Sequence, residues 1–126
     1  MSGDANAGVN YAAVQRIALA LPGVEEGTSY GTPSFKVRKK MMTRLWEDGE
    51  TMVVRIDFAT REALMQAEPE VYYITDHYRD YPAVLVHLSR VTEADLRELL
   101  TECWHFVAPP RLVAEYVTQP KPERRV

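Results

Sequence analysis

A short window of the chain gathers basic side chains without any acidic residue between them. Residues 30–45 read YGTPSFKVRKKMMTRL, although the whole chain carries a net charge of -3. Clustered Lys and Arg side chains neutralise phosphate groups, so this window predicts a surface for a polyanion such as DNA. The alternative is that the charges only keep the solvent-facing side of a sheet hydrated. The expected DNA contacts are Lys36, Arg38, Lys39, Lys40, Arg44 and Arg55, with Trp46 beside them to stack on an unpaired base.

A second stretch, TDHYRDYP, places aromatic and titratable groups between two segments of strand character. Asp76 could orient the imidazole of His77, while Tyr78 and Arg79 could hold an anionic ligand. Residues 76–81 therefore offer a second hypothesis, a ligand- or protein-interaction module with no nucleic-acid role. The alternative is a rigid loop whose tyrosines pack on the end of the sheet.

The sequence contains no recognisable catalytic or cofactor-binding motif. Its three histidines, His77, His87 and His105, are too far apart to form a spacing motif, and no glycine loop precedes a helix as a phosphate-binding loop requires. Cys103 is the sole cysteine, which excludes an internal disulfide and predicts a buried thiol. We therefore expect a non-enzymatic protein with no metal or other cofactor.

Length and composition indicate one ordinary globular domain. The chain has 126 residues, of which 46% are hydrophobic and 26% charged. No run approaches the roughly 20 apolar residues that span a bilayer, and the first residues lack the order of a signal peptide. We expect a cytoplasmic monomer without membrane contact, its domain covering residues 9–116 and its termini, 1–8 and 117–126, flexible.

Around the basic window, Asp48-Gly49 predicts a two-residue type I′ hairpin turn. The register that follows pairs Leu45 with Met52 and Met41 with Ile56 on one apolar face. We expect a three-residue loop, Arg38-Lys39-Lys40, before this hairpin, because a two-residue loop would place Phe35 beside Arg44 and bury Lys36 in the core. The opposite face then carries Lys36, Met42, Arg44, Trp46, Val53 and Arg55.

The other elements follow from apolar periodicity and end signals. Apolar residues from 14 to 21 and from 96 to 107 recur at helical spacing, the second run opening with a capping box at Thr92. Thr60 is the expected N-cap of a short helix that ends before Pro69. Residues 24–33 read as a turn-rich connector, and 72–74 and 83–88 as strands. Pro109 and Pro110 stop the last helix, and a mobile polar tail follows. This order predicts an α+β domain, an antiparallel sheet packed on one face by N- and C-terminal helices.

Four segments together resemble the MmcQ/YjbR family. They read LPGVEEGTSYGTPSFKVRKKMMTRL, TMVVRIDF, EPEVYYITDHYRDYPAVLVHL and ELLTECWHFVAP, and the resemblance covers about residues 17–116. It implies a CyaY-like, or frataxin-like, α/β sandwich and a DNA-binding role. Lys39 stands where members of this family usually have a Gly in the hairpin loop.

Overall fold

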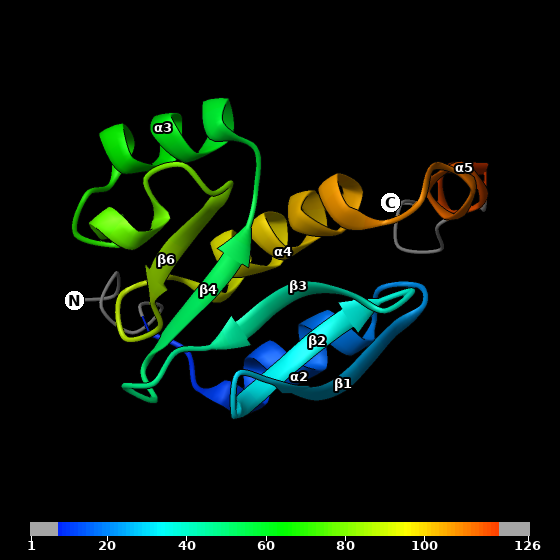
Figure 1. Cartoon of the computed structure of the whole chain (residues 1–126), viewed down its shortest axis with the longest axis horizontal. Coiled ribbons are helices and arrows are strands. Elements are labelled where there is room, and N and C mark those ends of the chain that lie inside the picture. Colours follow the sequence, from blue (N-terminus) through cyan, green and yellow to red (C-terminus); the bar gives the residue numbers. More distant parts are fainter. Residues whose placement is uncertain (1–7, 119–126) are drawn as a thin grey trace.

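The computed structural model describes residues 8–118 as an antiparallel sheet backed by helices (Figure 1). The six strands lie in the order β1-β2-β3-β4-β6-β5. Helices α2 and α4 cover one face of the sheet, which confirms the predicted α+β architecture. The elements are α2 (Tyr11–Leu19), β1 (Val24–Ser29), β2 (Thr32–Val37), β3 (Lys40–Leu45), β4 (Thr51–Arg55), α3 (Phe58–Ala67), β5 (Tyr72–Tyr73), the 3-10 turn η1 (Asp76–Tyr78), β6 (Ala83–His87), α4 (Glu93–Val107) and α5 (Pro110–Thr118).

The main core lies between the sheet and helices α2 and α4. Trp104 of α4 is fully buried there, and its indole N–H donates to the carbonyl oxygen of Pro22 at 2.8 Å. Phe35 and Met52 of the sheet are fully buried in the same core. Helix α4 begins at the predicted cap, where the Thr92 hydroxyl accepts from the Asp95 N–H. The burial of Cys103 is also as predicted.

The first two hairpins differ from the expected ones. Residues 24–29 form the edge strand β1 instead of a connector, and Tyr30-Gly31 turns it into β2. The next turn contains two residues, Arg38 and Lys39, and not the expected three, because Val37 pairs directly with Lys40. Both two-residue turns have positive φ at both positions, the requirement of a type I′ turn.

A bulge in β3 reconciles the short loop with the predicted burial. The register of β2 against β3 shifts between Phe35 and Lys36, so that Met42 is the extra residue of β3. Met42 is therefore fully buried in the main core, and Met41 lies on the opposite face, the reverse of the prediction. The expected pair of Met41 with Ile56 is not formed.

The β3–β4 hairpin keeps its predicted register with a different turn. Leu45 pairs with Met52 as predicted, but the connection has four residues, 47–50. Gly49 alone has the positive φ of this turn, and its N–H donates to the carbonyl oxygen of Trp46 at 3.0 Å. The Asp48 carboxylate accepts from the N–H groups of residues 50 and 51 and from the Thr51 hydroxyl. This carboxylate cap stabilises the longer loop.

The start of α3 and the segment after α4 also differ from the prediction. Helix α3 is capped by Asp57, whose carboxylate accepts from the N–H of Thr60, so Thr60 lies inside the helix. Helix α4 ends before Pro109 as predicted, but Pro110 begins the unpredicted helix α5, a position that proline favours. The predicted mobile tail, from residue 119, lies outside the described residues. No helix within residues 8–118 is both long and apolar enough to cross a membrane.

Candidate functional site: a basic groove on the open sheet face

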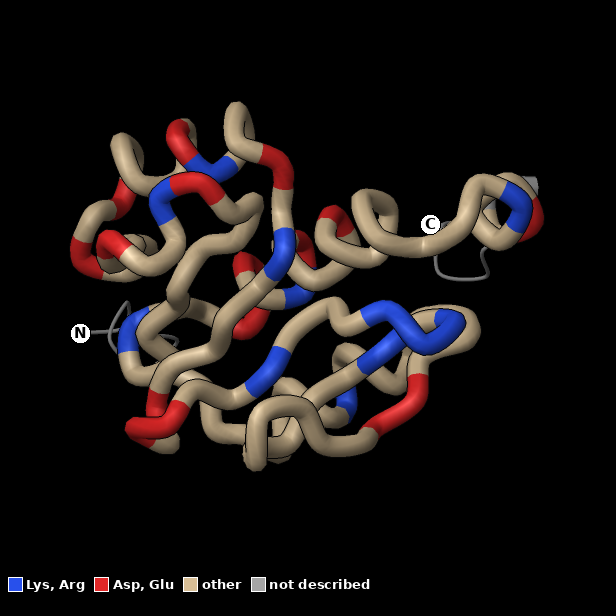
Figure 2. Tube along the Cα trace, in the orientation of Figure 1, with Lys and Arg blue, Asp and Glu red and all other residues tan. Residues whose placement is uncertain are grey.

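The face of the sheet turned away from α2 and α4, here called the open face, carries the predicted basic side chains. Lys and Arg positions of β2, β3, β4 and the β2–β3 turn gather on one part of the sheet (Figure 2). Lys36, Arg44 and Arg55 share this face, as the corrected register requires. The bulge brings Met41 between them, because it exchanges the faces of residues 41 and 42.

A hollow of about 590 Å³ opens between these strands and is called the basic groove below. Its cations are Lys36, Lys40 and Arg55, and no acidic side chain lines it. Glu25 is the cross-strand neighbour of Lys36, yet no ion pair joins them, and within residues 8–118 none of the three cations has an ion-pair partner. The lining residues are Thr28, Ser29, Tyr30, Lys36, Lys40, Met41, Arg55 and Tyr81.

Arg55 is held in place by aromatic rings rather than by a carboxylate. Its guanidinium carbon lies 5.6 Å from the centre of the Tyr81 ring and 5.7 Å from that of Phe106. Its Nε atom is buried and has no hydrogen-bond partner among the described residues. Ring faces orient a guanidinium without neutralising it, so the positive charge stays directed at the groove.

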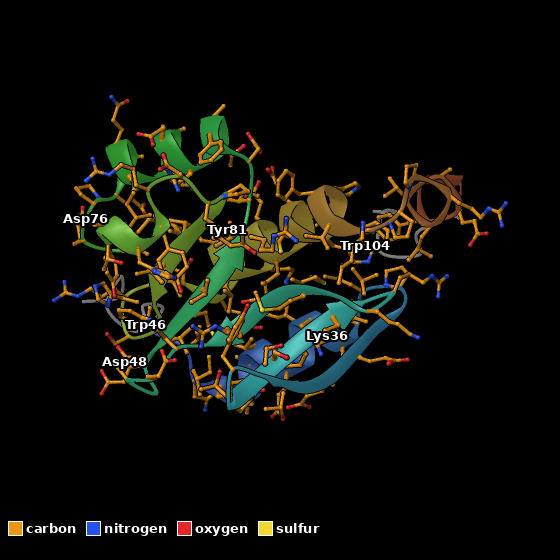
Figure 3. The ribbon with its side chains drawn as sticks, in the orientation of Figure 1. Lys36, Trp46, Asp48, Asp76, Tyr81 and Trp104 are labelled. Atoms are coloured by element: carbon orange, nitrogen blue, oxygen red, sulfur yellow. The ribbon has the colours of Figure 1, made fainter. Side chains whose placement is uncertain are left out.

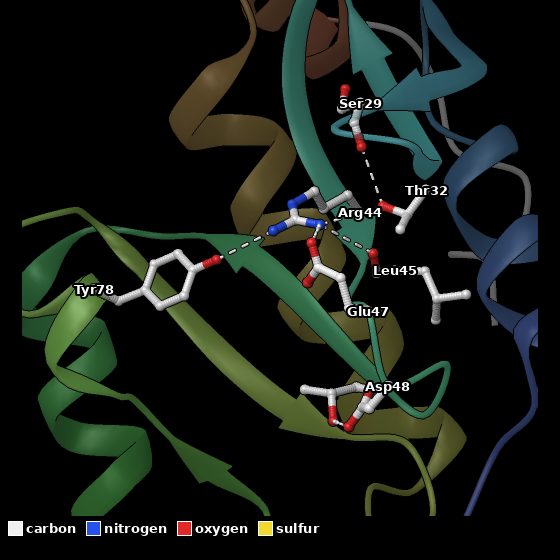
Figure 4. A network of polar contacts seen from close by, with 8 residues as sticks. Ser29, Thr32, Arg44, Leu45, Glu47, Asp48 and Tyr78 are labelled. Atoms are coloured by element: carbon white, nitrogen blue, oxygen red, sulfur yellow. Dashed lines mark hydrogen bonds and ion pairs between the residues drawn. The ribbon is translucent and has the colours of Figure 1, made fainter.

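Arg44 is placed differently from the exposed phosphate contact that we expected. It is only 7% exposed, and Figure 4 shows its guanidinium inside a polar network. It donates to the Thr32 hydroxyl at 3.3 Å and to the Tyr78 hydroxyl at 3.4 Å. The Glu47 carboxylate lies 3.4 Å away, and the Tyr30 ring stacks over the guanidinium at 5.1 Å. Arg44 thus links β3 to the 3-10 turn and to Tyr30.

A second hollow of about 550 Å³ continues the basic groove toward the 3-10 turn. The two hollows share Tyr30, Met41 and Tyr81, and the second adds His77 and Tyr78 to the wall. The structure therefore brings His77 and Tyr78, two of the four residues of the second predicted site, next to the basic groove. The full lining of this second hollow is Tyr30, Met41, Arg44, Glu47, Val53, His77, Tyr78 and Tyr81.

Several predicted site residues lie outside both hollows. Asp76 and Arg79 form an exposed ion pair with each other at 2.7 Å. Arg38 and Lys39 are exposed at the tip of the β2–β3 turn. Trp46 is half-buried against a small cluster on the open face and lies near the β3–β4 turn, away from Lys36 (Figure 3).

The sequence prediction missed the two tyrosines that flank the basic groove. Tyr30 is 81% exposed, and Tyr81 is 40% exposed, which is unusual for large aromatic side chains. Tyr30 occupies a type I′ turn position with φ of 54°. The only sequence signal for this hairpin tip was the glycine that follows Tyr30, because Gly31 readily adopts the positive φ of a type I′ turn.

Other chemistry is restricted in the described part of the chain. Cys103 is fully buried, its thiol donates to the carbonyl oxygen of Met42 at 3.3 Å, and burial raises its pKa to about 12. A thiol with so high a pKa is a poor nucleophile. Within residues 8–118 no three His, Cys, Asp or Glu side chains come together as metal ligands.

Comparisons with known proteins agree with the family resemblance. The YjbR family model matches residues 19–106. The uncharacterised proteins Rv2570 of Mycobacterium tuberculosis and Mb2600 of Mycobacterium bovis are each 38% identical to this chain over 89 residues, which is 68% of this chain and 69% of theirs. The crystal structure of Deinococcus radiodurans protein DR2400, with a DUF419 domain, has a TM-score of 0.70 over 87% of this chain and 89% of its own. Its 21% identity shows the shared fold alone. On the strength of the family match and the mycobacterial relatives, the chain belongs to the YjbR family.

Proposed function

We propose that this protein is a non-enzymatic nucleic-acid-binding protein that holds a single strand of DNA in the basic groove. The observation that carries the proposal is the concave cluster of Lys36, Lys40 and Arg55, which have no ion-pair partner among the described residues. Cations left unpaired around a hollow favour an anionic ligand, and a phosphate backbone supplies several anions in a row.

The aromatic side chains favour a single strand over a duplex. Tyr30 and Tyr81 border the same groove, and exposed rings beside a cationic track can stack on unpaired bases. The bases of a duplex are already stacked and would leave these rings without a partner. Arg38 and Lys39 extend the positive charge to the hairpin tip, where they can contact further phosphates.

The affinity comes from phosphate contacts, so we expect little sequence specificity and strong dependence on salt. The net charge of -3 opposes the approach of DNA at long range, which makes the local cluster decisive. Binding should therefore be measurable at low ionic strength and should fall steeply as salt is added.

The test is fluorescence anisotropy of labelled single- and double-stranded DNA of mixed sequence over a salt series. The variant Lys36→Gln/Lys40→Gln removes two groove charges and should reduce the slope of log K against log salt by about 1.4, at about 0.7 for each phosphate contact. The matched control, Arg16→Gln/Arg90→Gln, removes two charges outside the groove lining and should leave the slope unchanged. Failure of the unmodified protein to bind single strands at low salt would overturn the proposal. Equal salt slopes for the groove variant and the Arg16/Arg90 control would overturn it as well.

A ring-specific variant tests the stacking contribution separately. Tyr30→Asn removes the aromatic ring but keeps a residue that tolerates positive φ before Gly31. We expect single-strand affinity to fall by roughly 1–3 kcal/mol, the usual value of one stacked base. Tyr30→Phe keeps the ring and should bind as the unmodified protein does.

A small anionic ligand is the second candidate, favoured by the hollow of about 550 Å³ beside His77 and Tyr78. This volume lies within the range of small-molecule sites. Isothermal titration calorimetry with mononucleotides and dicarboxylates distinguishes the candidates. A single saturable site for one of these compounds, together with no oligonucleotide binding, would favour the ligand-module hypothesis.

A further inference from the structure

A separate groove lies between α3 and α4 and is called the α3–α4 groove below. It differs from the basic groove in charge and in the residues that line it. It is a hollow of about 220 Å³ whose rim carries the carboxylates of Glu68, Asp95, Glu98 and Glu102. Leu64 and Leu99 contribute aliphatic surface to its walls. An aliphatic channel with an acidic rim is complementary to a flexible carbon chain that ends in ammonium groups.

The acidic side chains of this groove have no cationic partner within residues 8–118. Asp95, Glu98 and Glu102 follow one another at helical spacing on α4, where acidic positions recur (Figure 2). Like charges four residues apart, such as Glu98 and Glu102, destabilise a helix. By contrast, Glu93 on the same helix is paired with Arg16 at 2.8 Å and with Arg97 at 2.9 Å.

Two further side chains of α4, Arg97 and His105, line a different hollow. This concavity of about 680 Å³ adjoins the α3–α4 groove farther along α4 and shares Glu98 and Glu102 with it. The Arg97 guanidinium is engaged by Glu93, and the His105 ring contacts the Thr101 carbonyl oxygen at 3.1 Å. In the described part of the chain, the carboxylates of the rim over Leu64 and Leu99 therefore form no ion pair.

Tyr72 supplies an independent reason to expect a ligand. Its side chain lines the groove although the residue is only 3% exposed, and its hydroxyl has no hydrogen-bond partner among residues 8–118. Among the described residues, the fully buried side-chain polar atoms without a partner belong to Arg55 and Arg61, so the Tyr72 hydroxyl is accessible from the groove. An unpaired hydroxyl at the end of an otherwise enclosed side chain is available to a ligand. Burial, with the charges of Asp95, Glu68 and Glu98, raises the pKa of Tyr72 to about 12, so this hydroxyl is neutral at physiological pH. Its oxygen can accept from an ammonium group that also contacts the carboxylates.

We infer that the α3–α4 groove binds a linear aliphatic polyamine, with methylenes on Leu64 and Leu99 and ammonium groups on the acidic rim and the Tyr72 hydroxyl. A divalent metal fits less well, because no three acidic, His or Cys side chains converge as ligands in residues 8–118. The apolar walls would also leave a hydrated metal without partners, whereas they match a methylene chain.

Isothermal titration calorimetry of the full chain with spermidine tests this inference. Butylamine, which has one ammonium group, and Mg²⁺ at the same ionic strength serve as comparison probes. Spermidine should bind at one site at least about tenfold more tightly than butylamine, because additional charged hydrogen bonds form. Spermidine binding no tighter than that of either comparison probe would overturn the inference, since screening alone would then explain the result.

Two variants locate the site. Glu98→Gln/Glu102→Gln keeps the side-chain shapes but removes two charges, and it should weaken spermidine binding by about tenfold or more. The matched control Glu25→Gln/Glu50→Gln removes two exposed carboxylates outside the groove and should change nothing. Tyr72→Phe should weaken binding by several fold while the other contacts persist. Equal loss in the groove variant and the control would place the binding elsewhere and contradict the inference.

Discussion

The guanidinium of Arg61 donates to the carbonyl oxygen of Tyr81 at 2.9 Å, although the two residues are 20 positions apart. Arg61 lies on α3 and is 3% exposed. The same nitrogen, Nη1, also donates to the carbonyl oxygens of Tyr78 at 2.9 Å and Ala83 at 3.1 Å. One buried side chain thus fixes the loop that brings Tyr81 to the basic groove.

Replacing this arginine should destabilise the protein markedly. Arg61→Met keeps the aliphatic volume but deprives several buried carbonyl groups of their donor. Each such group costs about 1–3 kcal/mol, so we expect the free energy of unfolding to fall by about 3 kcal/mol or more. Urea denaturation measures this change. In the control Arg79→Met, which removes an exposed ion pair with Asp76, the loss should stay below about 1 kcal/mol. Equal losses would contradict this role of Arg61.

The sequence could not have identified Arg61 as a buried residue. It did predict which face of the sheet most strand residues occupy. Burial cost separated Phe35 and Val37 from Lys36, because apolar side chains on alternate positions must share one face. No comparable periodicity tells which arginine of a polar helix face will be buried. That depends on which carbonyl groups a loop distant in sequence presents to the helix.

The β2–β3 connection shows a different limit of sequence reasoning. The prediction of a three-residue loop rested on strict alternation of side chains between the two faces of β2 and β3, without a bulge. The bulge at Met42 adds one residue to β3, so a two-residue turn achieves the same burial of Phe35 and exposure of Lys36. Bulges lack a strong sequence signal, and the exchange of Met41 and Met42 could therefore be found only in the structure.

The left-handed conformation of Lys39 predicts a stabilising substitution. Lys39 has φ of 73°, a region that costs a residue with a Cβ atom roughly 1–2 kcal/mol. Lys39→Gly should therefore be more stable than Lys39→Ala by about 1 kcal/mol in urea denaturation, after allowance for the flexibility of glycine in the unfolded chain. The two variants lose the same charge, so their difference isolates the backbone strain. Identical stabilities would show that this turn is not strained.

The cap of α3 predicts a pH-dependent stability. The Thr60 hydroxyl and backbone N–H donate to the Asp57 carboxylate at 2.7 and 3.0 Å, and these hydrogen bonds hold its pKa below the ordinary value of 3.8. The ionised cap thus stabilises the fold above that ordinary value, and this contribution is lost as the pH falls through the lower folded-state pKa.

We expect Asp57→Ala to reduce the free energy of unfolding by about 1 kcal/mol at neutral pH. The difference from the unmodified protein should shrink as the pH falls below 3.8, which urea denaturation over a pH series would show. Asp57→Asn keeps a capping oxygen without the titrating charge, so its stability should be close to that of the unmodified protein at neutral pH. A difference for Asp57→Ala that stays constant down to low pH would contradict the proposed cap titration.

The thiol of Cys103 should report the opening of the core directly. It is fully buried, and its hydrogen bond to the carbonyl oxygen of Met42 connects α4 to the bulge of β3. Because burial raises its pKa to about 12, very little thiolate is present at pH 8, and an aromatic disulfide reagent should react only when the core opens. The reaction rate should rise with urea alongside unfolding, and Arg61→Met should react faster than the unmodified protein. Rapid stoichiometric labelling in native buffer would contradict this and would mean that α4 separates from β3 without global unfolding.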